Sequence, residues 1–284
     1  MRVLVLGGNG MLGNQLLKDW IGKSYICIYT SVRGNTFENY HLLPAEKIIK
    51  NISAQDTVSI DRAIKISRPD VIINCIGIIK QLPTAKDPIA SITTNSLFPH
   101  QIAQLCQKYK AKLIQISTDC VFSGNKGNYT EQDNPDPIDL YGRTKLLGEV
   151  SIPNCLTIRT SIIGRELNSK NSLVEWFLSQ KGKTVKGYNR AIYTGFTTQA
   201  LAQILEKIIL EHPNLEGLWH VSSDPITKYQ LLNMMNQTFN LGITIERDEN
   251  FVCDRSLNSQ KFRDFTGFTP PTWEDMTAQL ALSQ

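Results

Sequence analysis

Short runs of apolar residues recur along the first half of the chain, and each run is continuous rather than alternating with polar positions. We predict strands at Val3–Leu6, Tyr25–Tyr29, Val71–Cys75, Lys112–Ser117 and Leu156–Ser161. Strands that are apolar on both faces are typical of a parallel sheet covered by helices on each side.

Amphipathic stretches separate these strands. Behind the first strand, apolar residues fall at helical spacing, and further helices are predicted at residues 57–67, 95–110 and 139–151. Strands and helices that alternate through right-handed crossovers predict an α/β fold, a Rossmann-type doubly wound parallel sheet.

The rhythm of the pattern changes after residue 162. We predict helices at residues 171–180, 198–210, 228–239 and 272–283, and one more strand at 217–222. We therefore expect a first domain of residues 1–162, with return elements at about residues 190–222. A smaller, interrupted C-terminal domain would hold residues 163–189 and 223–284.

Composition and charge exclude several classes of protein. The 284 residues are 41% apolar and 20% charged, and 30 basic against 26 acidic residues leave a net charge of +4. Such a weak, dispersed excess does not indicate binding to nucleic acid or to a membrane surface. No apolar run reaches the length of a transmembrane helix or a secretory segment, and the six cysteines stand singly. We expect reduced thiols in a cytoplasmic protein, no metal site among the four histidines, and a possible homodimer.

A glycine-rich turn follows the first strand directly and opens the first helix. Gly7, Gly10 and Gly13 have the spacing G-x-x-G-x-x-G. The unpaired amides and partial positive charge of a helix N-terminus suit a pyrophosphate, and glycine lets the backbone approach it closely. The turn could instead be a tight connection only. Its place at the start of a βαβ unit favours a dinucleotide site.

The end of the second strand bears on which dinucleotide binds. A Rossmann domain that selects NAD usually carries an acidic residue there, to bind the ribose 2′-hydroxyl. This chain has Thr30-Ser31-Val32-Arg33 instead. Ser31 and Arg33 could hold a 2′-phosphate by charge-assisted hydrogen bonds, which favours NADP(H) over NAD(H). The alternative is that Arg33 points from a loop into solvent.

Three groups suited to reducing a ketone follow in chain order. Thr118 lies where the fourth strand ends, and Tyr141 and Lys145 are one helical turn apart. A phenol can donate the proton that a reduced carbonyl needs, provided that a nearby ammonium stabilises the phenolate. The Thr118 hydroxyl could orient the carbonyl oxygen. Taken separately, the pair could be exposed side chains and Thr118 a strand-end cap; Asn95, which we expect to open a helix, could be an N-cap.

Together these motifs resemble the extended short-chain dehydrogenases/reductases, and most of all the dTDP-4-dehydrorhamnose reductase branch. The residues that carry the resemblance are Gly7–Gly13, Ser117–Phe122, Tyr141-x-x-x-Lys145 and Arg159–Gly164. It implies a catalytic triad of Thr118, Tyr141 and Lys145. The residues expected to bind the cofactor, NADP(H) with NAD(H) as the alternative, are Gly7, Asn9, Gly10, Met11, Leu12, Gly13, Ser31, Arg33, Asn51, Ile52, Cys75, Ile76, Gly77, Asn95, Ser117, Tyr141 and Lys145.

The resemblance also implies that the C-terminal part of the chain holds a sugar nucleotide. The residues expected to contact the substrate are Thr118, Asp119, Cys120 and Arg255. The chain departs from the family pattern at several of these positions. Asn51 replaces an acidic residue, Cys75-Ile76-Gly77 replaces a small alanine-rich turn, and Cys120 replaces an aromatic residue. Arg255 begins a stretch that lacks the family's proline, so it could bind a substrate phosphate or form a surface ion pair.

Three functions fit this pattern. The first is NADPH-dependent reduction of the 4-keto group of a nucleotide-activated deoxysugar, for cell-surface polysaccharide synthesis. The second is an epimerase or dehydratase that retains NAD, against which the absence of an acidic pair beside Thr118 argues. The third is a non-catalytic, NADP-binding regulatory subunit, like the relative that serves methionine adenosyltransferase.

Overall fold

The computed structural model describes residues 1–34, 42–167 and 172–282, and these fall into two compact units. The first unit comprises Met1–Ser117, Asp139–Ile158 and Ala202–Leu218, and the second comprises Thr118–Ile138, Arg159–Leu201 and Trp219–Gln284. The chain thus crosses between the units several times. We expected residues 118–138 in the first domain, whereas the structure groups them with the second unit.

A seven-stranded sheet organises the first unit. Its strands are β1 (Arg2–Leu6), β2 (Cys27–Ser31), β3 (Ile48–Ile49), β4 (Val71–Asn74), β5 (Lys112–Ile116), β6 (Cys155–Arg159) and β10 (Gly217–His220). Their order across the sheet is β10-β6-β5-β4-β1-β2-β3, and the pairs from β3 to β6 are parallel. The order reverses between β1 and β4, which is the point where ligands of such sheets bind.

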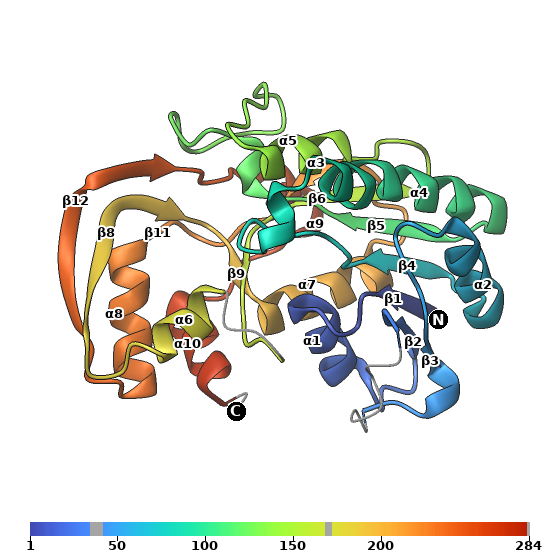
Figure 1. The fold of residues 1–284 in the computed structure, drawn as a ribbon, viewed down its shortest axis with the longest axis horizontal. Helices are drawn as coiled ribbons and strands as arrows, with labels where there is room; N and C mark the ends of the chain where they lie inside the picture. Colours follow the sequence, from blue (N-terminus) through green and yellow to red (C-terminus); the bar gives the residue numbers. More distant parts are fainter. Residues whose placement is uncertain (35–41, 168–171, 283–284) are drawn as a thin grey trace. The chain divides into compact units, whose positions relative to one another are not determined.

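Helices cover both faces of this sheet, as Figure 1 shows. They are α1 (Met11–Trp20), α2 (Thr57–Ser67), α4 (Phe98–Tyr109) and α7 (Thr198–Glu211), with α5 (Leu140–Leu147) beside α4. Leu4 and Leu6 of β1 pack with Ile60 of α2 and Ile102 of α4 in one buried cluster. The predicted doubly wound α/β fold is confirmed, because continuous apolar strands bury both of their faces.

The second unit contains a smaller, three-stranded sheet in the order β11-β8-β12. Its strands are β8 (Thr184–Tyr193), β11 (Ile226–Thr227) and β12 (Thr244–Asp254). β12 pairs with β8 in parallel, and β11 pairs with it antiparallel. The other elements are the strand pair β7 (Ile162–Ile163) and β9 (Phe196–Thr197), and the helices α6 (Leu173–Leu178), α8 (Lys228–Phe239), α9 (Gln260–Thr266) and α10 (Trp273–Leu282).

Several predicted elements have different bounds. The strand expected at Tyr25 begins at Cys27, and the helix expected to run to residue 151 ends at Leu147. Gly148 is the C-cap of that helix, and the absence of a Cβ there lets the chain pass close to the carbonyl oxygen of Asn95. Within the described ranges, the strands β3, β7, β8, β9, β11 and β12 and the helix α9 were not predicted. β8 alternates exposed and buried positions over its first residues, and β12 has no buried position, so neither strand has the continuous apolar run from which strands were predicted.

The helix expected from residue 95 is in fact longer and irregular. It begins with the single turn α3 (Pro88–Ser91), continues as a π-helical segment, η3 (Ile92–Leu97), and only then becomes α4. Asp87 caps its first turn, because its carboxylate accepts from the amides of Ile89 and Ala90. The prediction that Asn95 opens a helix is therefore wrong, since Asn95 lies inside the run.

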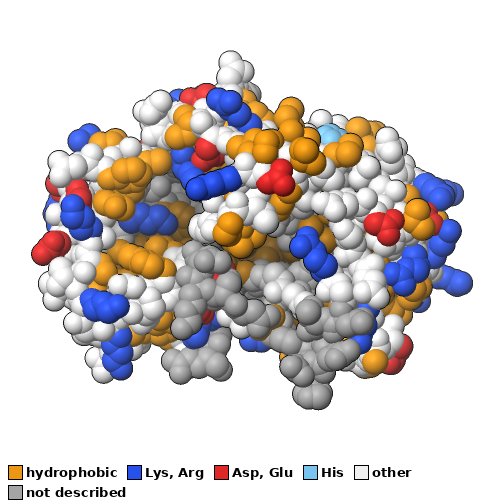
Figure 2. Space-filling view, viewed as in Figure 1, with side chains coloured by type: hydrophobic (Ala, Val, Ile, Leu, Met, Phe, Trp, Pro, Cys, Tyr) orange, Lys and Arg blue, Asp and Glu red, His pale blue; other side chains and the backbone are white. Residues whose placement is uncertain are grey.

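The surface agrees with the dispersed charge of the sequence. Figure 2 shows basic and acidic side chains interspersed over the visible face, with no single large basic area. Within the described ranges, no helix is long and apolar enough to cross a membrane.

The close packing of α1 on β1 depends on Gly13. A Cβ on Gly13 would lie well inside contact distance of the Gly7 carbonyl oxygen, which belongs to the backbone and has no rotamer with which to escape. We expect Gly13→Ala to lower the free energy of unfolding by about 2–3 kcal/mol, although alanine normally favours a helix. Urea unfolding measures this, with Gly77→Ala as the control, because a Cβ there meets only the Asn95 side chain at 3.4 Å. Equal free energies of unfolding for the two variants would contradict the claim that α1 needs glycine at position 13 to pack on β1.

Candidate active site

The glycine turn leaves a helix N-terminus open to a ligand. Gly7 has a left-handed backbone, with φ at 88°, and its carbonyl oxygen accepts from the Gly10 amide at 2.9 Å. Gly10 is the N-cap residue of α1, so no side chain caps the first turn, which begins with Met11, Leu12 and Gly13. The amides of that turn are the donors that a pyrophosphate needs.

The ends of the neighbouring strands border this turn. A Cβ on Gly7 would come to 3.0 Å from the Ile76 side chain and 3.4 Å from the Cys75 carbonyl carbon. On the other side, Ser31 is buried, and its hydroxyl accepts from the Gly7 amide at 3.3 Å. The predicted residues at the ends of β1, β2 and β4 therefore lie together. Ser31 also braces the turn, a role that the sequence did not suggest.

The segment after β2 lies next to the segment after β3. The Asn51 amide donates to the Gly34 carbonyl at 3.2 Å, and the Ile52 amide donates to the Val32 carbonyl at 3.1 Å. Arg33 is exposed, and Asn51 has a left-handed backbone, with φ at 58°. The residues predicted to surround the adenosine part of a cofactor are thus neighbours, whereas residues 35–41 of this loop lie outside the described ranges.

The Asn95 side chain connects the loop after β4 to helix α5 through hydrogen bonds. Its side chain is buried, accepts from the Ile78 amide at 2.9 Å and donates to the Ile78 carbonyl at 3.0 Å. Its amide also donates to the Thr144 hydroxyl of α5 at 3.3 Å. Because these bonds use its side chain, Asn95 fixes the loop after β4 and the helix that carries Tyr141 and Lys145.

Lys145 is a buried ammonium at the carboxyl end of β5. Its Nζ donates to the Ile116 carbonyl at 2.6 Å. Burial lowers the pKa of Lys145 to about 8, although the nearby Glu149 and Cys75 favour the charged form. Burial likewise raises the pKa of the Cys75 thiol to about 12, so that group is uncharged near neutrality. With a pKa of about 8, the fraction of Lys145 that is charged near neutrality depends on its burial and on the groups close to its Nζ.

Tyr141 stands one helical turn before Lys145 on α5 and is half-buried. Asp139 accepts from the Gly142 amide at 2.8 Å and so caps the helix directly in front of this phenol. Ser117, the last residue before the chain enters the second unit, donates to Glu149 at 2.7 Å. Glu149 was not predicted, although its position four residues after Lys145 is a signal that could have identified it.

The second unit begins with Thr118, which caps a short helical turn of Asp119–Val121. The Thr118 hydroxyl accepts from the Cys120 amide and donates to the Asp119 carboxylate, each at 3.1 Å. Burial raises the pKa of Asp119, whereas Arg255, the Thr118 hydroxyl and Lys228 act in the opposite direction. Burial raises the pKa of Cys120 to about 12. The Thr118 hydroxyl is thus oriented by Asp119.

Arg255 turns toward this short helical turn. Its Nε donates to the Phe122 carbonyl at 2.9 Å, and its Nη1 lies 3.7 Å from the Cys120 sulfur. Both of these contacts are to residues of the predicted substrate region in the second unit.

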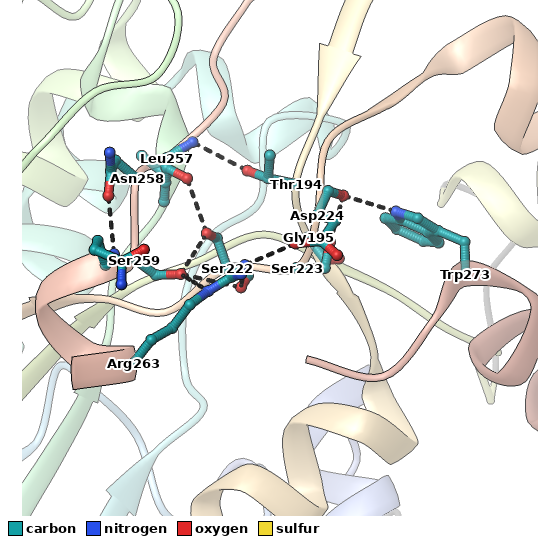
Figure 3. Close-up of polar contacts among 11 residues, drawn as sticks. Thr194, Gly195, Ser222, Ser223, Asp224, Leu257, Asn258, Ser259, Arg263 and Trp273 are labelled. Atoms are coloured by element: carbon teal, nitrogen blue, oxygen red, sulfur yellow. Dashed lines mark hydrogen bonds and ion pairs between the residues drawn. The ribbon is translucent and has the colours of Figure 1, made fainter. Parts of the chain in front are cut away.

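A polar network holds the chain that follows Arg255, as Figure 3 shows. The Ser222 hydroxyl donates to the Leu257 carbonyl at 2.8 Å, and its oxygen lies within hydrogen-bond distance of the Ser259 hydroxyl, at 2.9 Å. Arg263 of α9 donates to Ser259 at 3.1 Å and pairs with Asp224 at 3.0 Å. Without the proline of the family pattern, this stretch keeps its path through side-chain hydrogen bonds.

Two residues near Asp119 were not predicted. Lys228, the first residue of α8, places its Nζ 3.7 Å from the centroid of the Tyr193 ring. Tyr193 is buried, and its hydroxyl has no hydrogen-bond partner within the described part of the chain. Neither residue belongs to a recognisable motif, so only the folded chain brings them to Asp119. Among the described residues, no three His, Cys, Asp or Glu side chains gather as metal ligands.

Known proteins share this architecture. The dTDP-4-dehydrorhamnose reductase of Bacillus anthracis, in complex with NADP, has a TM-score of 0.80 at 22% identity, covering 100% of this chain and 99% of that one. The UDP-glucose 4-epimerase of Thermus thermophilus, in complex with NAD, has a TM-score of 0.78 at 16% identity, with coverage of 100% and 99%. At these identities the likeness shows the fold.

Two curated relatives are similar in sequence. Methionine adenosyltransferase 2 subunit beta of Rattus norvegicus is 25% identical over 253 residues, covering 84% of this chain and 72% of the relative. A probable low-salt glycan biosynthesis reductase of Haloferax volcanii is 26% identical over 239 residues, covering 78% and 75%. The family model described as RmlD substrate binding domain matches residues 1–281. The protein therefore belongs to the RmlD substrate binding domain family, and the predicted resemblance to extended short-chain dehydrogenases/reductases is confirmed.

Proposed function

We propose that this protein is an NADPH-dependent reductase of the 4-keto group of a nucleotide-activated deoxysugar. The observation that carries the proposal is the buried Lys145 ammonium at the carboxyl end of β5, one helical turn from the Tyr141 phenol. A cation held at that edge of a Rossmann sheet suits proton transfer to a ketone better than it suits a purely structural role.

The residues of the first unit fit a dinucleotide. The uncapped first turn of α1 would bind the pyrophosphate, and the ends of β1, β2 and β4 would surround the rest. NADPH, when bound, supplies the hydride. Exposed Arg33 and the absence of an acid at the end of β2 favour the 2′-phosphate form. NADP in the Bacillus anthracis structure is consistent with this preference, and NAD in the epimerase structure marks the alternative.

The protein's own groups would then manage the proton. Tyr141 donates its phenolic proton to the ketone oxygen, and Lys145 stabilises the phenolate that remains. Thr118 orients the ketone oxygen by a hydrogen bond from its hydroxyl. That hydroxyl donates to Asp119 in the structure, so it must rotate away from the carboxylate to donate to a substrate.

The second unit is proposed to bind the substrate, with Asp119, Cys120 and Arg255 among the contacts. The Haloferax volcanii relative, by its name a probable glycan biosynthesis reductase, supports a role in making cell-surface polysaccharide. The six free cysteines are compatible with the reducing cytoplasm, where nucleotide sugars and NADPH are available. A homodimer remains a prediction.

A second function is a regulatory subunit that binds NADP and a partner enzyme. The observation that favours it is the similarity to methionine adenosyltransferase 2 subunit beta over 84% of this chain. A stoichiometric partner that co-purifies, together with no turnover of any keto sugar, would establish it. The epimerase or dehydratase alternative predicts tightly retained NAD and no net consumption of NADPH.

The reductase proposal predicts the behaviour of Tyr141→Phe. We expect the wild-type protein to oxidise NADPH with at least one of a panel of dTDP-, UDP- and GDP-linked 4-keto-6-deoxy sugars. Tyr141→Phe should lower kcat by about 10²- to 10⁴-fold and leave NADPH binding unchanged, because only the proton donor is lost. Tyr109→Phe is the control, since that phenol donates to Asp61 on another face of the unit. Near-normal turnover by Tyr141→Phe would refute the assignment of the proton donor.

The cofactor preference predicts a selective effect of Arg33→Ala. Removing the guanidinium should raise the KM for NADPH about tenfold, the cost of one charge-assisted hydrogen bond, and leave the KM for NADH unchanged. Steady-state kinetics with both cofactors measures this. If both constants changed equally, Arg33 would not bind the 2′-phosphate.

The buried Lys145 ammonium, which the proposed reaction needs, is predicted to lower the free energy of unfolding. Burial lowers the pKa of Lys145 from 10.5 to about 8. This shift corresponds to a loss of about 3 kcal/mol from the free energy of unfolding below pH 8, because the folded state must bury the charge. Between pH 8 and 10.5 the unfolded chain holds a proton that the folded chain has released, so the cost disappears as pH rises.

We therefore expect Lys145→Met to raise the free energy of unfolding of the cofactor-free protein at pH 7 by about 1–3 kcal/mol, after allowing for the lost bond to Ile116. The same variant should lose turnover. Urea unfolding at pH 7 and pH 9.5 tests the explanation, because the difference from wild type should shrink at the higher pH. A variant that is less stable at pH 7 would contradict it.

A further inference from the structure

One ammonium group of the second unit, that of Lys228, has no hydrogen-bond acceptor among the residues that the structure describes. Thr227 caps α8 by accepting from the Gln230 amide, and the Gln230 side chain accepts from the Thr227 amide in return. This capping box fixes the backbone of Lys228, the next residue. The Lys228 side chain is half-buried, and its Nζ lies over the Tyr193 ring at 3.7 Å from the centroid. Within residues 1–34, 42–167 and 172–282, it donates no hydrogen bond.

The surroundings of Lys228 make this arrangement costly without a ligand. Burial lowers the pKa of Lys228 to about 8, while Asp119, Cys120 and Cys253 favour its charged form. An ammonium carries three donors, and the Tyr193 ring attracts its charge without accepting a conventional hydrogen bond. Because the Lys228 side chain is only half-buried, a ligand oxygen could displace water from its Nζ and supply the acceptor that the described residues do not.

Asp119 provides the opposite kind of group. Its carboxylate is buried and accepts from the Thr118 hydroxyl, yet a carboxylate has room for about four hydrogen bonds. Arg255, the other cation near Asp119, already donates to the Phe122 carbonyl. The second unit therefore presents a donor without an acceptor next to a carboxylate with spare acceptor capacity.

We propose that Lys228 and Asp119 bind neighbouring hydroxyl groups of the sugar, with Lys228 donating to one oxygen and Asp119 accepting from the other. A sugar offers oxygens that both donate and accept, so it satisfies both side chains together. A phosphate offers acceptors only, and the Asp119 carboxylate would repel it. The inference rests on the proposed function for the identity of the ligand, and it makes Lys228 a residue that selects the sugar rather than the nucleotide.

Calorimetric titration of the NADP-saturated protein tests this with paired ligands. The panel holds dTDP, UDP and GDP together with dTDP-glucose, UDP-glucose and GDP-mannose, so that each sugar nucleotide is compared with its own nucleoside diphosphate. We expect Lys228→Met to raise the Kd of the sugar nucleotide that binds wild type by about tenfold or more. The Kd of the matching diphosphate should stay within about twofold of the wild-type value. Lys261→Met is the matched control, because Lys261 also lies over an aromatic ring, that of Trp219 at 4.0 Å.

Each outcome has a distinct meaning. Equal weakening of sugar nucleotide and diphosphate would show that Lys228 binds phosphate, and no weakening of either would show that it binds neither part; both results overturn the inference. If wild type binds no member of the panel, the proposed substrate class fails, and the inference fails with it. The proposed function stands when only the effect of Lys228→Met is missing.

A second measurement uses the wild-type protein and so does not depend on how the variant folds. Reductive methylation at pH 8, followed by peptide mass spectrometry, reports the reactivity of each lysine. We expect the sugar nucleotide to protect Lys228 at least about fivefold, as an oxygen bound to the amine would, and the diphosphate to give no protection. Equal protection by both ligands, or protection by neither, would overturn the assignment.

Discussion

The burial of one ammonium group organises the candidate catalytic region of the first unit. Lys145 donates to a carbonyl at the end of β5, and its helix is attached to the π-helical segment η3 through Thr144 and Asn95. Asn95 in turn holds the loop that follows β4. Because a buried cation tolerates little displacement from its partners, this chain of bonds fixes α5 against two strand ends. The position of the Tyr141 phenol follows from it.

Sequence periodicity predicted the strands of the large sheet except β3, and the candidate cofactor residues of the glycine turn, β2 and β4 lie at the ends of predicted strands. The glycine turn, the end of β2 and the Tyr141–Lys145 pair are local motifs, and local spacing determines their geometry. The strands β8 and β12 were not predicted because they lack a continuous apolar run, and they pair with each other along most of their length. Lys228 escaped for a related reason: it lies more than a hundred residues from Asp119, and no short motif connects them.

The members of this family and its structural neighbours share one scaffold but carry names of different activities, from a glycan reductase to a subunit of methionine adenosyltransferase. The first unit is suited to a dinucleotide in any of these roles. We therefore expect differences in function to arise in the side chains of the second unit, which we propose to bind the substrate. Cys120, in place of an aromatic residue, and the cations near Asp119 are the features of this chain at that place.

The wide helical turn of η3 has a consequence for how the chain tolerates change in length. A π-turn holds an extra residue, so the residues on its two sides differ in angular position by roughly 100° from those of an uninterrupted α-helix. This offset lets Asn95 face the loop after β4 while Phe98 and Ile102 face the core. Loss of a single residue between Ile92 and Leu97 would restore an ordinary α-helix. The helix would then lose either the hydrogen bonds of Asn95 to the loop after β4 or the contacts of Phe98 and Ile102 with the core. Insertions and deletions should be rarer here than in the exposed loops.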